Sequence, residues 1–181
     1  MTDPTFPEPS DQSPLPPDDP RRELAVVRPE SDDLRHIALA GDIYTILLSG
    51  EQTDGRYCLI DMRVPPGGGP PPHRHDFEEM FTVLHGRIRF TFRGEDVDVS
   101  AGETVNIPAN APHHFRNVSG EPARMTCMCT PAGQEEFFLR IAPRVDRTAT
   151  APPELTEAEQ AANRDEPHSW PPGTAPSCSD H

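Results

Sequence analysis

The chain has 181 residues, a length that suits one globular domain, and its formal net charge is −14 at neutral pH. This acidic excess argues against nucleic acids and anionic membranes as partners, because both require a concentrated basic surface. All 16 basic side chains are arginine, so there is no lysine amine for a Schiff base and none for a Walker-type phosphate loop.

Proline is concentrated at both ends of the chain. Residues 1–29 contain eight of the 24 prolines, and residues 143–181 contain seven. Both ends also combine Ser, Asp and Glu with few aromatic residues, a composition that cannot bury enough apolar surface to offset the entropy lost on ordering. We therefore predict a disordered tail over residues 1–33, a folded domain over residues 34–142 and a mostly disordered tail over residues 143–181.

The sequence shows no segment typical of export or membrane insertion. No stretch near the start joins basic residues to an apolar run, and no run approaches the length needed to span a bilayer. We expect a cytoplasmic protein whose four cysteines are reduced thiols.

Between the tails, short apolar or alternating runs are separated by turn residues, a pattern typical of an all-β sandwich or barrel. Residues 87–93 alternate most clearly, and Gly86 and Gly94 at their ends suit hairpin turns that need positive φ. Short helices are predicted over residues 133–142 and, more weakly, over residues 156–162. The predicted strands are residues 43–49, 57–64, 78–84, 87–93, 96–99, 104–107, 113–118 and 123–129.

The segment from Gly67 to Glu79 carries two histidines and a carboxylate that have the same parity. On a strand, His73, His75 and Glu79 would point to one face. A carboxylate buried there without a partner would be costly, and a metal cation removes that cost. Two imidazoles and a carboxylate form the facial arrangement that binds divalent iron, manganese, nickel or zinc and leaves positions open for water or substrate.

A second segment, from Gly102 to Asn117, places a further histidine at the start of a predicted strand. Together the two segments resemble the two motifs of the cupin superfamily. The first motif matches at every fixed position, namely Gly67, His73, His75, Glu79 and Gly86. The second matches at Gly102, Pro108, His113 and Asn117. It departs at Asn110, where the family usually has glycine, but asparagine tolerates the left-handed conformation that the turn requires.

This resemblance implies an all-β fold, a cupin jelly-roll β-barrel with the metal inside, followed by a short C-terminal helix. By the family pattern the metal ligands are His73, His75, Glu79 and His113. His114 has the opposite parity to its neighbour and is expected to face outward. A cupin barrel without metal is the alternative, and the presence of all four ligand types favours a metalloprotein.

Several other residues allow two interpretations. Cys127 and Cys129 share one strand face and are read as small buried core side chains, with a soft-metal site or a redox pair as the alternatives. Glu78 is expected to be a solvated acid rather than a general base, and His85 is expected at the surface. The apolar side chains expected near the metal are Phe81, Phe115 and Met125.

The resemblance extends to the single-domain, quercetin-dioxygenase-like cupins and implies a metal-dependent oxygenase acting on a small organic, phenolic substrate. Residues 131–138 are also similar to a Pro-x-Gly-x-Glu-x-Phe-Phe segment that follows the barrel in such proteins. A non-catalytic small-molecule-binding cupin and a metal-dependent isomerase or cyclase stay open, because this fold hosts many reactions. We expect one divalent metal ion, iron before manganese, nickel or zinc, and a homodimer paired through sheet edges.

Overall fold

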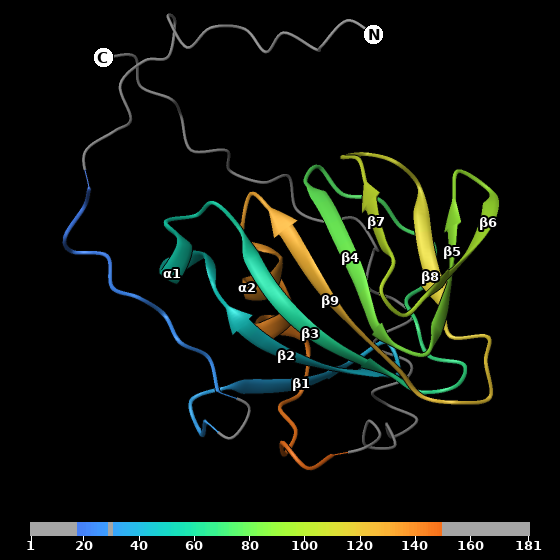
Figure 1. Ribbon diagram of the computed structural model, residues 1–181, viewed down its shortest axis with the longest axis horizontal. Coiled ribbons are helices and arrows are strands. Elements are labelled where there is room, and N and C mark those ends of the chain that lie inside the picture. Colours follow the sequence, from blue (N-terminus) through green and yellow to red (C-terminus); the bar gives the residue numbers. More distant parts are fainter. Residues whose placement is uncertain (1–17, 29–30, 150–181) are drawn as a thin grey trace, which may run out of the picture.

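The structure is a computed structural model that describes residues 18–28 and 31–149 (Figure 1). Most of the two predicted tails and the helix predicted over residues 156–162 lie outside this range. Within it, the strands and helices are β1 (Arg35–Leu39), β2 (Asp42–Leu48), α1 (Gly50–Thr53), β3 (Cys58–Val64), β4 (Glu78–His85), β5 (Arg87–Phe92), β6 (Glu95–Ser100), β7 (Thr104–Ile107), β8 (His113–Arg116), β9 (Ala123–Thr130) and α2 (Gln134–Ile141). Neither helix in the described part of the chain is long and apolar enough to cross a membrane.

The strands form two antiparallel sheets that lie face to face (Figure 1). The larger sheet has the order β1-β2-β3-β9-β4-β7, and the smaller has the order β6-β5-β8. Because each sheet is apolar on one face, the two apolar faces pack together and form the core between them. This arrangement confirms the predicted all-β fold class, and α2 is the predicted short helix after the barrel.

All eight predicted strands are present, with ends that differ by at most two residues, but β1 and α1 were not predicted. β1 joins β2 through Ala40 and Gly41, whose φ angles of 53° and 86° are both positive. A two-residue hairpin turn of this kind favours Asn-Gly or Asp-Gly, because the polar side chain of Asn or Asp stabilises the left-handed backbone and the methyl group of alanine does not. The turn signal was therefore missing, and the strand before it was not recognised.

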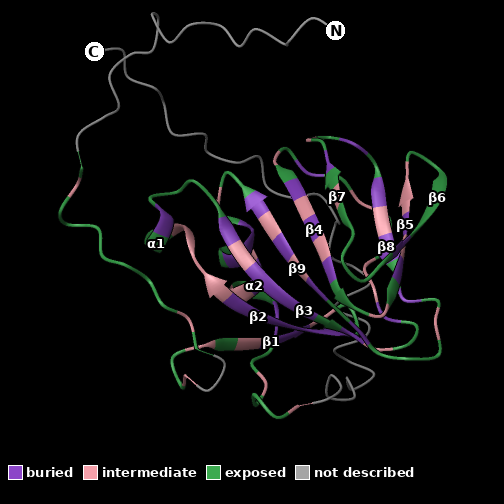
Figure 2. Cartoon of the chain, viewed as in Figure 1, coloured by how far each residue is buried: buried purple, intermediate pink, exposed green. Residues whose placement is uncertain are grey.

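Aromatic side chains from both sheets fill the core. Phe81 of the larger sheet contacts Phe90 and Phe115 of the smaller one, with ring centroids 5.2 and 5.7 Å apart. All three are buried, as is Met125. Figure 2 shows the buried stretches along β3, β4, β8 and β9, whereas the edge strand β6 is mostly exposed. The space between the two sheets is therefore lined by buried aromatic side chains.

α2 packs against the larger sheet and is held by a buried carboxylate. Glu135 accepts hydrogen bonds from the backbone N–H of Gly50 at 2.6 Å and of Gly133 at 2.9 Å. Ala132 N also donates to Gly55 O at 3.0 Å. The two hydrogen bonds to Glu135 satisfy a carboxyl side chain on a residue that is only 1% exposed. They fix the first turn of α2, and with it the neighbouring residue Gln134, relative to the barrel.

Candidate metal centre

A glycine loop after β3 is bound to the end of β8. Gly67 N donates to Asn117 O at 2.8 Å, and Asn117 N donates to Gly68 O at 3.0 Å. Gly69 has a φ of 127°, and a Cβ atom there would lie 2.2 Å from the carbonyl oxygen of Phe115. Only glycine fits this approach. The loop is thereby held against the smaller sheet, where it delivers the following histidines.

The histidines are positioned by backbone hydrogen bonds between two loops and β8. His73 and His113 exchange both of their N–H to carbonyl bonds at 3.0 Å. The backbone N–H of Asn110 donates to the carbonyl of His75 at 2.6 Å. Asn110 has a φ of 64°, the left-handed conformation expected for this departure from the family pattern. His73 and His75 lie on a loop rather than a strand, so strand parity does not explain their common direction.

All three imidazoles have the same tautomer. The Nδ1 atoms of His73, His75 and His113 lie 2.8, 2.9 and 2.9 Å from the backbone carbonyl oxygens of Pro71, Phe77 and Ala111. A carbonyl only accepts hydrogen bonds, so each Nδ1 carries the proton, an assignment made from the hydrogen-bond partner. Each Nε2 atom is therefore the nitrogen available to a metal, which binds it in its unprotonated form.

Glu79, from β4, is the buried centre of the cluster. Its Oε2 atom lies 2.9 Å from His75 Nε2 and 3.1 Å from His113 Nε2. Burial raises the pKa of this carboxyl, but hydrogen bonds with the two histidines outweigh it and hold the pKa below its usual range. For His113, burial lowers the pKa, while the contacts with Glu79 and Ala111 outweigh it and raise it. The carboxylate is thus ionised and faces the histidine nitrogens.

The four side chains fit a divalent metal ion. One ligand atom from each of His73, His75, Glu79 and His113 lies within 4.8 Å of the others. When the imidazoles of His75 and His113 are neutral, the lone pairs of their Nε2 atoms point at the lone pairs of Glu79 Oε2. These lone pairs repel unless a cation or a proton lies between them. Three neutral imidazoles and a carboxylate are a borderline donor set that suits iron, manganese, nickel or zinc.

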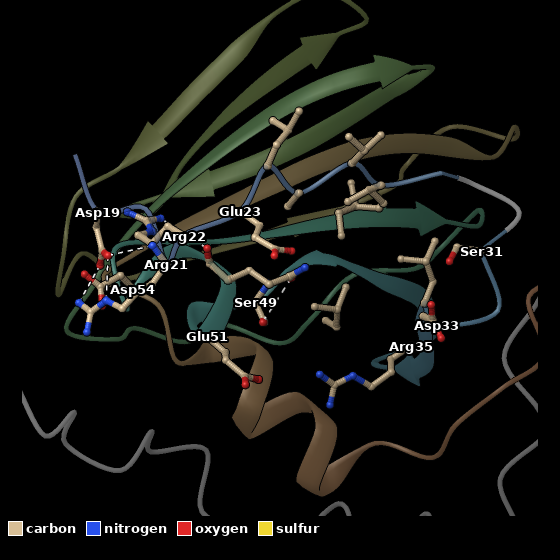
Figure 3. A pocket seen from close by; sticks show the side chains of 18 residues that line it. Asp19, Arg21, Arg22, Glu23, Ser31, Asp33, Arg35, Ser49, Glu51 and Asp54 are labelled. Atoms are coloured by element: carbon tan, nitrogen blue, oxygen red, sulfur yellow. Dashed lines mark hydrogen bonds and ion pairs between the residues drawn. The ribbon is translucent and has the colours of Figure 1, made fainter.

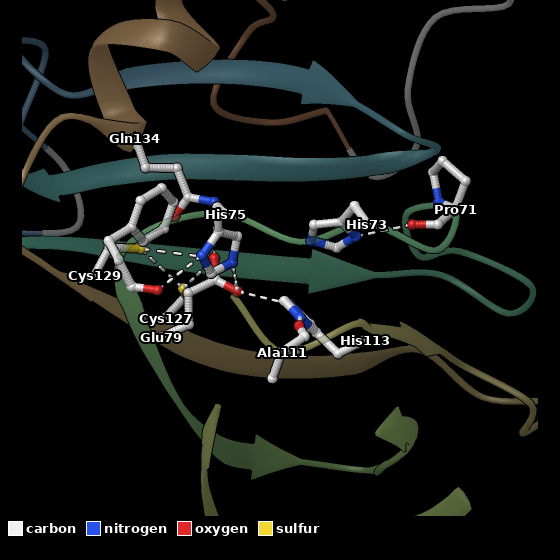
Figure 4. A network of polar contacts seen from close by, with 10 residues as sticks. Pro71, His73, His75, Glu79, Ala111, His113, Cys127, Cys129 and Gln134 are labelled. Atoms are coloured by element: carbon white, nitrogen blue, oxygen red, sulfur yellow. Dashed lines mark hydrogen bonds and ion pairs between the residues drawn. The ribbon is translucent and has the colours of Figure 1, made fainter. Parts of the chain in front are cut away.

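The other oxygen of Glu79 faces a different group of side chains (Figure 4). Gln134 Nε2 of α2 donates to Glu79 Oε1 at 2.8 Å. The Sγ atoms of Cys127 and Cys129, from β9, each lie 3.8 Å from the same oxygen. Cys129 also donates to Gln134 Oε1. Sequence reasoning missed Gln134, because it belongs to neither motif and its residue type alone indicates no site.

Burial also sets the charge of the surrounding groups. It raises the pKa of Cys127 to about 12 and that of Cys129 well above its usual value, so both are thiols at neutral pH. Burial lowers the pKa of His73 to about 4, so its imidazole is neutral. His73 is only partly buried, whereas the other three predicted ligands are buried. His73 is therefore the member of the cluster with the greatest exposure to solvent.

The remaining candidates from the sequence lie away from this centre. Glu78 is exposed and accepts a hydrogen bond from Asn106 at 3.3 Å. His85 is exposed at the end of β4. His114 is half-buried on the face of β8 opposite His113, as its parity predicts. These three residues take no part in the cluster.

A buried carboxyl lies behind the glycine loop. Asp42 is 0% exposed, and its Oδ2 atom accepts a hydrogen bond from the Tyr44 hydroxyl at 3.2 Å. A Cβ atom on Gly68 would lie 2.2 Å from Asp42 Oδ1, so the loop packs directly on this carboxyl. Burial raises the pKa of Asp42 to about 8, and the Tyr44 hydrogen bond opposes it only in part. Asp42 is therefore largely protonated at neutral pH.

A separate cleft of about 800 Å³ lies between residues 19–27 and the β2–α1 region (Figure 3). Some of the charged side chains that line it form ion pairs with one another, since Arg21 Nε lies 2.8 Å from Asp19 Oδ1. None of the four clustered metal-binding candidates lines it. We assign no chemistry to this cleft.

Comparisons with known proteins place these observations in a family. The sequence profile described as Cupin domain matches residues 60–129. Polyketide synthase CurC of Streptomyces cyaneus is 33% identical over 112 residues, which cover 58% of this chain and 71% of that protein. Quercetin 2,3-dioxygenase of Bacillus subtilis is 26% identical over 105 residues, which cover 57% of this chain but only 31% of that protein.

A solved structure shows the same fold. The polyketide cyclase RemF from Streptomyces resistomycificus superposes with a TM-score of 0.54 at 20% identity. The superposition covers 78% of this chain and 94% of that protein. At this identity the similarity supports the fold and nothing further.

Proposed function

The chain belongs to the cupin family, and from this premise we propose that it is a metal-dependent oxygenase acting on a small organic substrate of phenolic type. Membership of the family confirms the prediction made from the two motifs, and the two packed antiparallel sheets confirm the predicted jelly-roll barrel. The proposed metal ligands are His73, His75, Glu79 and His113. The observation that carries the proposal is the convergence of three imidazoles, all with Nδ1 protonated, on one buried carboxylate.

The side chains around the centre have distinct tasks. A bound iron ion would supply redox chemistry and Lewis acidity at its open coordination positions. The carbonyls of Pro71, Phe77 and Ala111 hold the three imidazole rings in the binding tautomer. Phe77 also stacks on His75, with ring centroids 3.8 Å apart. Glu79 supplies the negative charge that compensates the cation, and the neighbouring aromatic core excludes water from the buried side.

Support for oxygenase chemistry comes from the 26% identity with the Bacillus subtilis quercetin 2,3-dioxygenase. This chain spans less than a third of that protein's length, so its substrate and activity enter here only as a proposal. Residues 131–138, which resemble the segment after the barrel in quercetin-dioxygenase-like cupins, form the turn before α2 and the first part of that helix, and they contribute Gln134 beside the carboxylate. Iron is the metal we propose, with manganese, nickel and zinc as the alternatives.

A second candidate is a metal-dependent isomerase or cyclase acting on a polyketide-type substrate. It is favoured by the 33% identity with polyketide synthase CurC, 71% of which this chain covers. Both candidates use the same ligand set, because a divalent ion can polarise a substrate oxygen with or without a redox step.

Two measurements on the purified chain separate these functions. Elemental analysis identifies the bound metal, and an oxygen electrode with a panel of phenolic substrates tests for oxygen uptake. Uptake that depends on iron and is lost in His113→Ala supports the oxygenase. Substrate conversion without oxygen uptake supports the isomerase or cyclase. Ligand binding without turnover, whichever metal is supplied, contradicts both and leaves a non-catalytic binding cupin.

The expected assembly and location stay predictions. A homodimer paired through sheet edges would have twice the chain mass in light scattering, and a cytoplasmic protein would remain in the cytoplasmic fraction after cell lysis. The expected partner is a small-molecule substrate or ligand.

A further inference from the structure

The Oε1 side of Glu79 brings two thiols and a carboxylate oxygen to one point. Cys127 Sγ and Cys129 Sγ lie 3.5 Å apart. Each lies 3.8 Å from Glu79 Oε1. Glu79 and Cys129 are directly paired on the neighbouring strands β4 and β9, and Cys127 is two residues away on the same face. The strand register therefore holds all three donors in place.

This triangle has the dimensions of three ligands around a tetrahedral ion. With Zn–S of about 2.3 Å and Zn–O of about 2.0 Å, tetrahedral angles require S···S of about 3.8 Å and S···O of about 3.5 Å. The corresponding distances in the structure are 3.5 Å and 3.8 Å. Movements of the donor atoms by a few tenths of an ångström therefore suffice to bind an ion here.

We propose that Cys127 Sγ, Cys129 Sγ and Glu79 Oε1 form a second metal site, for a thiophilic divalent cation such as Zn²⁺ or Cd²⁺. Thiolate ligands favour such ions over Mg²⁺ or Ca²⁺. Glu79 bridges the two sites, with Oε2 toward the histidines and Oε1 toward the sulfurs. A carboxylate oxygen has two lone pairs, so Oε1 binds the ion and still accepts the hydrogen bond from Gln134.

The charge balance permits this site in a buried position. Both sulfurs and the carboxylate are at least 98% buried, where added net charge would be costly. Binding forms two metal–sulfur bonds and breaks two S–H bonds, and the two protons leave to solvent. One divalent cation thus replaces two protons, and the net charge of the buried cluster does not change. Gln134 Oε1, which contacts Cys129, is a neutral oxygen beside the remaining coordination position.

Cadmium is a suitable probe, because thiolate-to-cadmium charge transfer gives an ultraviolet absorption that imidazole and carboxylate ligands do not give. The full chain is stripped of metal with a chelator and titrated with Cd²⁺, while bound cadmium is counted by elemental analysis. We expect two ions per chain and the charge-transfer band. One ion per chain without the band overturns the second site, and this test needs no variant.

Variants then assign the two ions. Cys127→Ala with Cys129→Ala should lose the band and retain one cadmium, whereas His73→Ala with His113→Ala should keep the band and lose the other ion. Cys178→Ser, which changes the cysteine outside the described residues, is the control for loss of a thiol and should keep both ions. A band that survives in the cysteine variant contradicts the proposal. A histidine variant that still binds two ions contradicts the ligand set of the proposed oxygenase instead, so the two failures are distinguishable.

Discussion

The two oxygens of Glu79 face chemically different halves of one buried cluster. Oε2 faces imidazole nitrogens delivered by the glycine loop and by β8, and both motifs of the sequence contribute to this half. Oε1 faces two thiols of β9 and an amide of α2, none of which belongs to either of the two cupin motifs. The comparison teaches that the two motifs contain the four clustered residues predicted as metal ligands, while the groups that contact the other carboxylate oxygen come from elsewhere in the chain.

Glu79→Gln should have the largest effect, because it is the substitution that alters both halves at once. The amide keeps the shape of the side chain but removes the negative charge that balances a buried cation. We expect metal content near zero after dialysis against metal-free buffer, measured by elemental analysis. Glu78→Gln is the matched control on the exposed neighbour and should retain metal. Normal metal content in Glu79→Gln would remove the carboxylate from the ligand set.

His113→Ala should break the imidazole half alone. Loss of a direct ligand should weaken metal binding by more than the ~10–100-fold that is typical for outer partners. Isothermal titration of the metal-stripped chain measures this change. His114→Ala changes the neighbouring residue on the opposite face of β8 and should bind metal normally. Equal affinities for the two variants would show that His113 is not a ligand.

Gln134→Leu should have a smaller effect, because it removes a hydrogen bond to the carboxylate rather than a ligand. Glu79 Oε1 would lose its donor at 2.8 Å in a fully buried position. We expect metal affinity to fall by ~10-fold, the lower end of the range for such partners. Glu136→Gln changes an exposed residue of the same helix and serves as the control. An unchanged affinity would mean that the motif residues alone orient the carboxylate.

Asp42→Asn should leave both halves intact and change only how stability depends on pH. The unfolded chain ionises this carboxyl above about pH 4, whereas the folded chain keeps the proton up to about pH 8. Folding therefore retains a proton in this window, and stability falls as pH rises, by at most ~1.4 kcal/mol per pH unit. Asparagine has no carboxyl proton to release, so the stability of the Asp42→Asn variant does not fall with pH for this reason.

Thermal melts of the metal-free proteins between pH 5 and pH 8 measure the effect. The melting temperature of Asp42→Asn should rise relative to the original chain as pH increases. Asp98→Asn is the control, because its hydrogen bond with Arg89 lowers the pKa of Asp98 and keeps it ionised throughout this range. Parallel curves for Asp42→Asn and the original chain would show that Asp42 is not protonated.

The sequence predicted the barrel and the four clustered residues for a local reason. Fixed spacing within each motif reflects short turns whose geometry depends on adjacent residues, such as Asn110 in its left-handed conformation. Gln134 was not predictable in this way, because its place depends on Glu135 binding Gly50, 85 residues earlier. β1 was missed because Ala40 stands where a two-residue hairpin turn usually has Asn, Asp or Gly before the glycine at its second position.

The two sheets of the barrel each contribute to the same cluster, Glu79 from the larger and His113 from the smaller. A bound ion would therefore act as a cross-link between the two layers, and its binding free energy would add to the free energy of unfolding. At a free metal concentration 100 times the dissociation constant this linkage amounts to ~2.7 kcal/mol. The metal supply of the cell would then control what fraction of the chain is folded as well as what the chain does.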